Sequence, residues 1–445
     1  MFHKFKYLLL LFPLLLSACS VIDKLLADKK IPLEGHGVSV VEYFPDSITP
    51  DDKLNSLDFK TPPQVENSYI DGRTHNVGNI LFNWQNLKLS RKLSIHPSHT
   101  LPLSSLPVIA EGKLVILEAT GILKAFDLVS GKILWENSFF SKFEKFFFGR
   151  HYLSGGILYE SRKLFVTAGV DTIGVFDIGD GKLLWQKSFS MPLRCIAAVS
   201  QDRVVLQGMQ DTLYVLDIQD GTMLWNRVNI GSKVQSLNAI TPIVMNDKIV
   251  LMQERNDKIV ALDLQTGREF WTLGTDSYSA FIKTGNIVAD HTPIYDNDMV
   301  FMPFDSGSLI AMHARNPQVL WKRYLMTIKA SWIAGDLLYT INERNQLLAV
   351  YKYNGLIKWV TDLKAYSGNK DKQDVDLYCT PPVVAGDLVL TINSAGQMLG
   401  FNLLTGKLEL NFKMPKGHYL RPFVHSNMLY VVNNNGTITI YSNKD

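Results

Sequence analysis

The chain has 445 residues, of which 46% are hydrophobic and 20% are charged, and its formal net charge is +3 at pH 7. This balance supplies enough apolar material for a large core and excludes a wholly disordered chain. The small net charge, without a basic stripe, argues against nucleic acid as a partner. The three cysteines, Cys19, Cys195 and Cys379, form no CxxC pair and no Cys/His cluster with metal spacing, so we expect no disulfide framework and no zinc site.

The first residues have the features of a secretory signal. Lys4 and Lys6 precede an apolar run at residues 7–16. This run is shorter than the roughly 20 apolar residues that a membrane span needs. We therefore predict that residues 1–18 are a signal peptide.

The residues Leu-Ser-Ala-Cys at 16–19 resemble the lipobox of bacterial lipoproteins. This resemblance implies that the Cys19 thiol is lipidated, that the chain is cleaved before Cys19, and that acyl chains such as palmitate anchor the protein. Because Ser20 rather than Asp follows, the resemblance also implies export to the outer membrane, with the anchor in the inner leaflet and the protein on the periplasmic face. A soluble periplasmic protein with an incidental cysteine is the alternative.

Residues 19–78 have a different composition from the rest of the chain. They contain five prolines and polar runs such as DSITPDDKLNS. Such a composition is typical of a poorly packed linker. We predict a lipidated tether that is mostly extended, with one short strand near residues 37–43.

One hairpin recurs through the remainder of the chain. It reads AFDLVSGKILW at 125–135, VFDIGDGKLLW at 175–185 and ALDLQTGREFW at 261–271. Each unit contains four short apolar strands that are separated by turn signals such as Asp-Gly and Thr-Gly, a pattern typical of an all-β repeat. Tryptophans mark the register at intervals of 38 to 51 residues: Trp84, Trp135, Trp185, Trp225, Trp271, Trp321 and Trp359. We expect these rings to fill the wedge between neighbouring sheets rather than to stack on a ligand.

Eight units begin along the chain, but the last ends after three strands, while the stretch around Trp84 supplies an outer strand with no unit before it. We therefore predict an all-β fold for residues 79–445, an eight-bladed β-propeller of four-stranded antiparallel blades that is closed by pairing of its N- and C-terminal strands. Seven blades plus an unrelated hairpin is the alternative. Cys195 and Cys379 then fall in opposite units, too far apart for a disulfide, and we expect both to be buried free thiols.

The hairpin with its outer tryptophan resembles the tryptophan-docking propellers of pyrroloquinoline-quinone (PQQ) dehydrogenases. Together with the lipobox and the tether, it resembles the BamB family, lipoprotein subunits of the outer-membrane β-barrel assembly machinery. This resemblance implies a scaffold whose propeller loops bind the POTRA domains of the barrel subunit BamA and which assists folding and insertion of outer-membrane proteins. Unfolded precursors of those proteins are a further possible partner, through pairing with the outer strands.

One BamA contact stretch of the family resembles Met-Pro-x-Leu-x-Leu-Arg. Here SMPLRC at 190–195 is similar, with two residues fewer. The similarity implies that Leu193 and Arg194 bind the partner. An ordinary loop with an exposed arginine is the alternative.

A periplasmic PQQ-dependent dehydrogenase and a propeller that binds a ligand in its channel are the alternative functions. The chain has no adjacent cysteines, no long insertions that could roof an active site, and no GxSxG, HExxH or P-loop signature. We therefore expect no enzyme activity, no catalytic residue, no cofactor and no metal site. His96 and His99 lie in a polar stretch without a third ligand. The Phe-rich stretch at 138–152 is expected to be buried, with a partner-facing patch as the alternative.

Overall fold

The computed structural model describes residues 48–66, 76–94, 105–118, 120–140, 155–193, 195–208, 211–228, 241–254, 258–274, 292–304, 307–327, 329–367, 377–433 and 436–443. All of them belong to one compact unit, residues 47–445. The predicted signal peptide, Cys19 and the first part of the predicted tether lie outside the described residues. No helix within the described ranges has the length and hydrophobicity that crossing a membrane would require.

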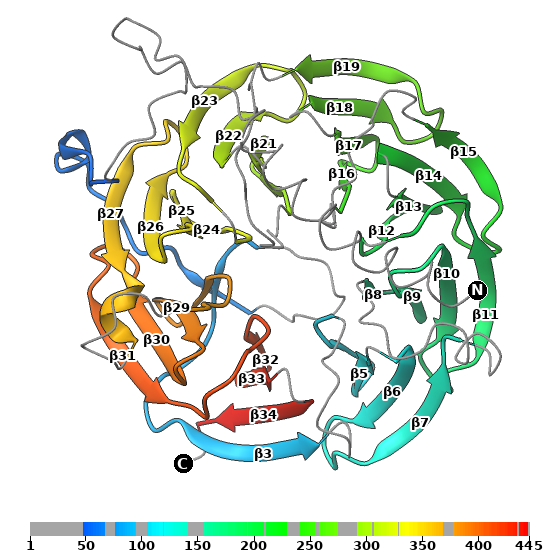
Figure 1. The fold of residues 1–445 in the computed structure, drawn as a ribbon, viewed down its shortest axis with the longest axis horizontal. Helices are drawn as coiled ribbons and strands as arrows, with labels where there is room; N and C mark the ends of the chain where they lie inside the picture. The colour runs from blue at the N-terminus through cyan, green and yellow to red at the C-terminus, as the bar shows by residue number, and fades with distance from the viewer. Residues whose placement is uncertain are drawn as a thin grey trace, which may run out of the picture. The chain divides into compact units, whose positions relative to one another are not determined.

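The described residues form eight sheets, and six of these sheets consist of four consecutive antiparallel strands. In these six sheets the first strand is innermost and the fourth is outermost (Figure 1). The strands are β4 Val108–Ala110, β5 Lys113–Leu117, β6 Ile122–Asp127 and β7 Ile133–Ser138; β8 Gly156–Glu160, β9 Lys163–Thr167, β10 Thr172–Asp177 and β11 Leu183–Ser188; β12 Ala198–Ser200, β13 Arg203–Gly208, β14 Thr212–Asp217 and β15 Met223–Arg227; β16 Ile243–Met245, β17 Ile249–Glu254, β18 Lys258–Asp263 and β19 Glu269–Gly274; β20 Ile294–Asp296, β21 Met299–Pro303, β22 Ser308–His313 and β23 Val319–Tyr324; β24 Trp332–Ala334, β25 Leu337–Ile341, β26 Gln346–Tyr351 and β27 Ile357–Asp362.

The other two sheets combine strands that are distant in sequence. One contains β32 Phe423–His425, β33 Met428–Asn433, β34 Thr437–Ser442 and β3 Lys88–Ser94, with β3 antiparallel to β34. The other contains β28 Val383–Ala385, β29 Leu388–Asn393, β30 Gln397–Asn402 and β31 Leu408–Lys413, together with β1 Gln64–Val65 and β2 Asn79–Ile80. An early strand, β3, therefore completes the sheet to which the last three strands belong.

The predicted all-β propeller of four-stranded antiparallel blades is confirmed. The prediction of eight four-stranded blades is corrected, because among the described residues seven sheets are four-stranded blades and the remaining sheet has six strands. The physical reason is that Ile80 pairs in parallel with Ala385 at the free inner edge of β28, and β1 then pairs with β2. An unpaired strand edge offers backbone donors and acceptors to any extended segment that reaches it.

The burial of the strands follows from their position in each sheet. The second strand KLVIL at 113–117 has four fully buried residues, because the neighbouring sheets cover both of its faces. The outer strand LELNFK at 408–413 alternates between half-buried and exposed residues. Continuous apolar runs therefore mark the inner strands, and alternating sequences mark the outer ones.

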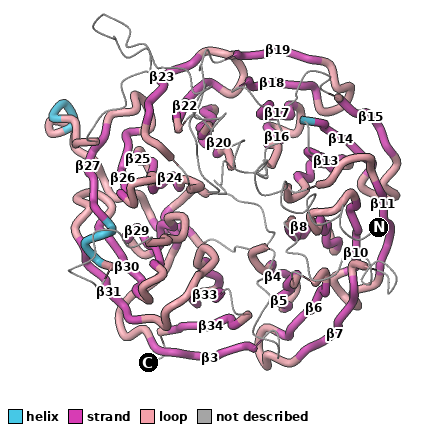
Figure 2. Tube along the Cα trace, viewed as in Figure 1, coloured by secondary structure: helices cyan, strands magenta, loops and turns pink. Residues whose placement is uncertain are grey.

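Residues 48–54 pack on the outer strands β23 and β27 of two sheets. The Asp51 N–H donates to Ile357 O over 2.8 Å, and its carboxylate accepts from the Ile357 N–H at 2.7 Å and from Arg323 at 3.0 Å. The short 3-10 helix η1 (Asp52–Leu54) follows and buries Leu54; Figure 2 shows it beside β27. A second 3-10 helix, η3 (Leu363–Tyr366), follows β27. Part of the segment that was predicted to be an extended tether therefore packs against the propeller.

Candidate functional site

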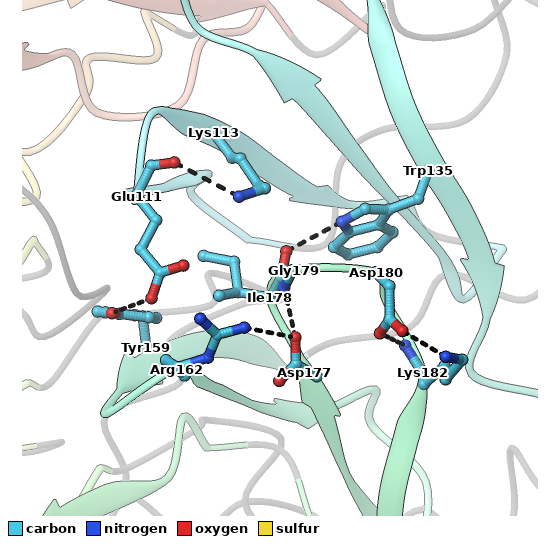
Figure 3. Close-up of polar contacts among 10 residues, drawn as sticks. All are labelled: Glu111, Lys113, Trp135, Tyr159, Arg162, Asp177, Ile178, Gly179, Asp180 and Lys182. Carbon is cyan, nitrogen blue, oxygen red and sulfur yellow. Dashed lines mark hydrogen bonds and ion pairs between the residues drawn. The ribbon is translucent and has the colours of Figure 1, made fainter.

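A repeated contact joins the outer strands β7, β11, β15, β23 and β27 to the next sheet, and we call it a docking seam. The Trp135 Nε1–H donates to Ile178 O over 3.0 Å, in the turn between β10 and β11 (Figure 3). The same bond recurs from Trp185 to Ile218 (3.3 Å), Trp225 to Leu264 (3.0 Å), Trp321 to Lys352 (2.7 Å) and Trp359 to Leu403 (2.9 Å). These rings are thus held between sheets, where they satisfy an acceptor in the following turn.

The turn that receives the indole is shaped by one aspartate and one glycine. Asp177 Oδ1 accepts from the Gly179 N–H at 2.6 Å and so fixes the start of the turn (Figure 3). Gly181 has a φ of +72°, which glycine adopts without strain. A Cβ atom at Gly181 would lie 2.5 Å from Trp135 Cε3. The glycine therefore allows both the turn and the close approach of the ring.

Charged side chains around this seam form pairs near the surface. Asp180 accepts from the Lys182 backbone N–H at 3.0 Å and from its ammonium group at 2.7 Å, and these bonds lower the pKa of Asp180 (Figure 3). Desolvation, with a 3.0 Å hydrogen bond to Glu111, raises the pKa of Tyr159. Exposed pairs of this kind contribute little to stability. These charged pairs therefore shape the turns, and their immediate surroundings account for the shifted pKa values of Asp180 and Tyr159.

Trp84 was predicted to pack between sheets, and its contacts differ from those of the docking seams. Its Nε1–H donates to Ala385 O over 3.0 Å, and its ring packs 4.5 Å from the ring of Phe82. The register of β3 instead places Arg91 after the bulge, at the position that Trp135 holds in β7. Arg91 donates to Leu128 O over 3.2 Å, in the turn that an indole would otherwise reach.

Two further tryptophans depart from the seam pattern. The described residues contain no docking bond from Trp271, and the turn that faces it has Pro317 where the other turns have glycine. Trp332, which lies outside the repeat register, begins β24 and donates to Gly78 O over 2.7 Å. Trp332 therefore holds the segment that leads to β2.

The predicted partner-binding pair is only partly described. Leu193 is fully buried, forms a β-bridge with Gly208, and donates its N–H to Val170 O over 2.8 Å. Its side chain therefore supports the loop from inside and offers no surface to a partner. Arg194 lies outside the described residues, so its role as a contact stays a prediction.

Both described cysteines are free and buried. Burial raises the pKa of Cys195 to about 11 and that of Cys379 to about 12. The two thiols are therefore protonated at neutral pH, and a protonated, buried thiol is a poor nucleophile. Within the described ranges, no group of three His, Cys, Asp or Glu side chains could hold a metal ion.

A cavity of about 220 Å³ lies beside the innermost strands β12, β16 and β20. Residues 196–200, 241–244 and 292–295 line it, together with Asn76, Val77 and Asp247. Among the described residues of this lining, Asp247 is the only charged one, and it accepts a hydrogen bond from Ser200. Asn76 is fully buried; its Oδ1 accepts from Arg421, while its Nδ2 has no partner. Sequence reasoning missed this site, although Thr-Pro pairs at 241–242 and 292–293 precede two of its strands.

Other sequence candidates lie at the margin of the described residues. His96 and His99 are outside them, as are residues 141–152 of the Phe-rich stretch. Phe139 and Phe140 are buried in the core with Phe176. The described part of the Phe-rich stretch therefore belongs to the core.

Comparison with known proteins shows a family match over residues 119–361, to the family described as outer membrane protein assembly factor BamB. An uncharacterized protein of Rickettsia prowazekii is 25% identical, over 68% of this chain and 74% of its own length. The outer membrane protein assembly factor BamB of Legionella pneumophila is 24% identical, over 44% of this chain and 49% of its own length.

Two solved structures illustrate the shared fold. BamB from Moraxella catarrhalis aligns with a TM-score of 0.63 at 17% identity, over 80% of this chain and 99% of its own. Quinohemoprotein alcohol dehydrogenase from Comamonas testosteroni aligns with a TM-score of 0.62 at 11% identity, over 83% of this chain and 80% of its own. An assembly factor and an enzyme therefore share this architecture, and the likeness of the structures concerns the fold alone.

Proposed function

The chain belongs to the family of the outer membrane protein assembly factor BamB, and from this premise we propose that it is a scaffold subunit of the outer-membrane β-barrel assembly machinery. In this proposal its propeller loops bind BamA, and it assists the folding and insertion of outer-membrane proteins. The observation that carries the proposal is the family match over residues 119–361, which includes the seam tryptophans from Trp135 to Trp359. Rigid blades with loops on their faces suit an interaction platform.

The proposed role is not catalytic. Three observations support this: the seam tryptophans are held between blades, both described thiols are protonated and buried, and the described part of the cavity lining contains a single charged residue. The rival function is a PQQ-dependent dehydrogenase. Purified protein that develops bound-quinone absorbance and oxidises alcohols after incubation with PQQ and Ca²⁺ would contradict the scaffold proposal.

The proposed location is the periplasmic face of the outer membrane, with a lipid anchor at Cys19. Its support is the lipobox-like sequence at 16–19. Labelled palmitate should enter the parent protein and the Cys195→Ala control, but not the Cys19→Ala variant. Equal labelling of Cys19→Ala would show that the anchor lies elsewhere.

Co-purification tests the proposed partner. Membranes that contain the full chain are solubilised, the protein is captured, and BamA in the eluate is measured. The variant Arg194→Glu should reduce the BamA yield, while the control Arg315→Glu, on a side chain that is 70% exposed in another blade, should not. No BamA with the parent protein would refute the scaffold proposal; an unchanged yield with Arg194→Glu would place the interface elsewhere on the propeller.

A further inference from the structure

A short segment of the chain runs along the innermost strands of two sheets. The Ile333 N–H donates to Asn76 O over 2.7 Å, and the Gly78 N–H donates to Ile333 O over 2.7 Å. Two residues later, Ile80 O accepts from the Gly386 N–H at 2.8 Å. Residues 76–80 therefore cover the inner edges of β24 and β28 as an added parallel strand.

Three other innermost strands present the same kind of edge. Ile333 is the middle residue of the three-residue strand β24, and its N–H and C=O point away from β25. Val199 in β12 and Tyr295 in β20 are likewise the middle residues of three-residue strands, each of which is followed by a two-residue turn. Val244 is the middle residue of the three-residue strand β16. In an antiparallel ladder, every second residue directs both its N–H and its C=O away from the neighbouring strand. Val199, Val244 and Tyr295 therefore direct these two groups inward, away from their own sheets.

These three residues all line the 220 Å³ cavity. Among the described residues, no segment pairs with β12, β16 or β20 in the way that residues 76–80 pair with β24 and β28. The cavity is also much larger than the roughly 10–15 Å³ that one water molecule needs. A ligand that carries its own backbone hydrogen-bonding groups would satisfy these edges.

The side chains of the lining restrict the chemistry of that ligand. Val199 and Ile243 offer apolar walls, which suit small or β-branched side chains. The unpartnered Nδ2 of buried Asn76 requires an acceptor, which a peptide carbonyl supplies. The exposed carboxylate of Asp247 favours a cation at one end of the ligand.

We propose that this cavity is a docking site for an extended polypeptide segment of a partner protein, with small apolar residues in its centre and a basic residue beside Asp247. The segment adds to the inner edges of β12, β16 and β20 as residues 76–80 add to those of β24 and β28. This inference goes beyond the scaffold role, because it depends on the strand edges and not on the family.

The probe is a fluorescent peptide that copies the segment NVGNI of residues 76–80 and ends in two lysines; its twin ends in two glutamates. Fluorescence anisotropy measures binding of each to the whole protein. The lysine peptide should bind saturably, and about threefold or more tightly than the glutamate peptide, because Asp247 attracts the one and repels the other. Equal binding of the two peptides, or no binding of either, would overturn the proposal.

A matched pair of proline variants tests the backbone contact. Val199→Pro removes the N–H that faces the cavity, and an edge strand tolerates proline when that N–H is not used within the sheet. Val424→Pro makes the same change at the same register of β32, outside the cavity lining. Val199→Pro should weaken binding about tenfold, or about 1.4 kcal/mol, and Val424→Pro should leave it unchanged. An equal effect of both variants would overturn the proposal.

A photo-crosslinking version of the peptide tests the site in the parent protein, so the result does not depend on whether a variant folds. Crosslinks to residues 196–200, 241–244 or 292–295 of the parent protein are the expected result. Crosslinks confined to outer strands would refute the proposed site. A small molecule that is released on denaturation, in a preparation that binds no peptide, would assign the cavity to another ligand.

Discussion

The docking seam makes a quantitative prediction for two glycines that share one backbone conformation. Gly181 has a φ of +72° and Gly112 a φ of +69°. A Cβ atom at Gly181 would lie 2.5 Å from the Trp135 ring, whereas one at Gly112 would meet nothing within 4 Å. The variants Gly181→Ala and Gly112→Ala therefore share the backbone strain and differ in the clash with the ring.

The expected magnitudes follow from these two contributions. The left-handed conformation costs an alanine about 1–2 kcal/mol, and this applies at both positions. Forcing an extra carbon into a packed contact costs about 1–3 kcal/mol more, and this applies at Gly181 alone. Gly112→Ala should therefore lower the free energy of unfolding by about 1–2 kcal/mol, and Gly181→Ala by about 2–5 kcal/mol.

Urea unfolding followed by circular dichroism measures both variants, and a double-mutant cycle isolates the ring. In a Trp135→Leu background the planar ring is gone, so the loss caused by Gly181→Ala should fall to that of Gly112→Ala. Equal losses for the two single variants, or a Gly181→Ala loss that persists in the Trp135→Leu background, would refute the seam as described.

Three further predictions concern the core, the thiols and the sheet that β3 completes. Leu193→Ala should lower the free energy of unfolding by about 2–5 kcal/mol, measured by urea denaturation, because it empties a fully buried site; an unchanged midpoint would contradict this burial. Cys195 and Cys379 should react with a thiol reagent at pH 8 only after denaturation. Because burial raises both pKa values, the unfolded state loses its thiol protons first, and stability should fall as the pH rises from about 9 to about 11; thiols that react in the native protein would refute this. Removal of residues 436–445 deletes β34 and leaves β3 without its partner, so the thermal midpoint should fall; an unchanged midpoint would show that the β3–β34 pair is not needed.

The repeated hairpins could be predicted from the sequence because their causes are local. In AFDLVSGKILW the aspartate and glycine set the turn, and the alternation of the outer strand follows within a few residues. The buried second strands, such as KLVIL at 113–117, could also be predicted, because a short apolar run between turn signals indicates a strand that is covered on both faces.

The features that sequence reasoning missed depend on contacts between distant residues. Arg91 takes the position of a seam tryptophan because β3 pairs with β34, and no tryptophan marks that register, so the search by tryptophan spacing chose Trp84 instead. The pairing of Ile80 with Ala385 is likewise set by the edge of β28 and not by any local pattern. Leu193 and Arg194 were treated as one surface pair, although a strand-like alternation would have separated their faces and placed Leu193 inside.

The strand β31 has Leu410 where six other outer strands have a tryptophan and β3 has Arg91; Leu410 lies opposite Gly400 and after the same bulge. In the sheet that follows, β34 and β3 pair without a turn between them, so no glycine turn receives the side chain of residue 410 as Gly181 receives the ring of Trp135. A leucine is smaller than a tryptophan and has no N–H that needs a partner there. The residue at 410 thus depends on chain connectivity in a different sheet. A circular permutant could join β34 to β3 by a turn like that of residues 178–182 and open the chain between β10 and β11. In that permutant Trp135 would lose the turn on which it docks, and a tryptophan at position 410 would become stabilising.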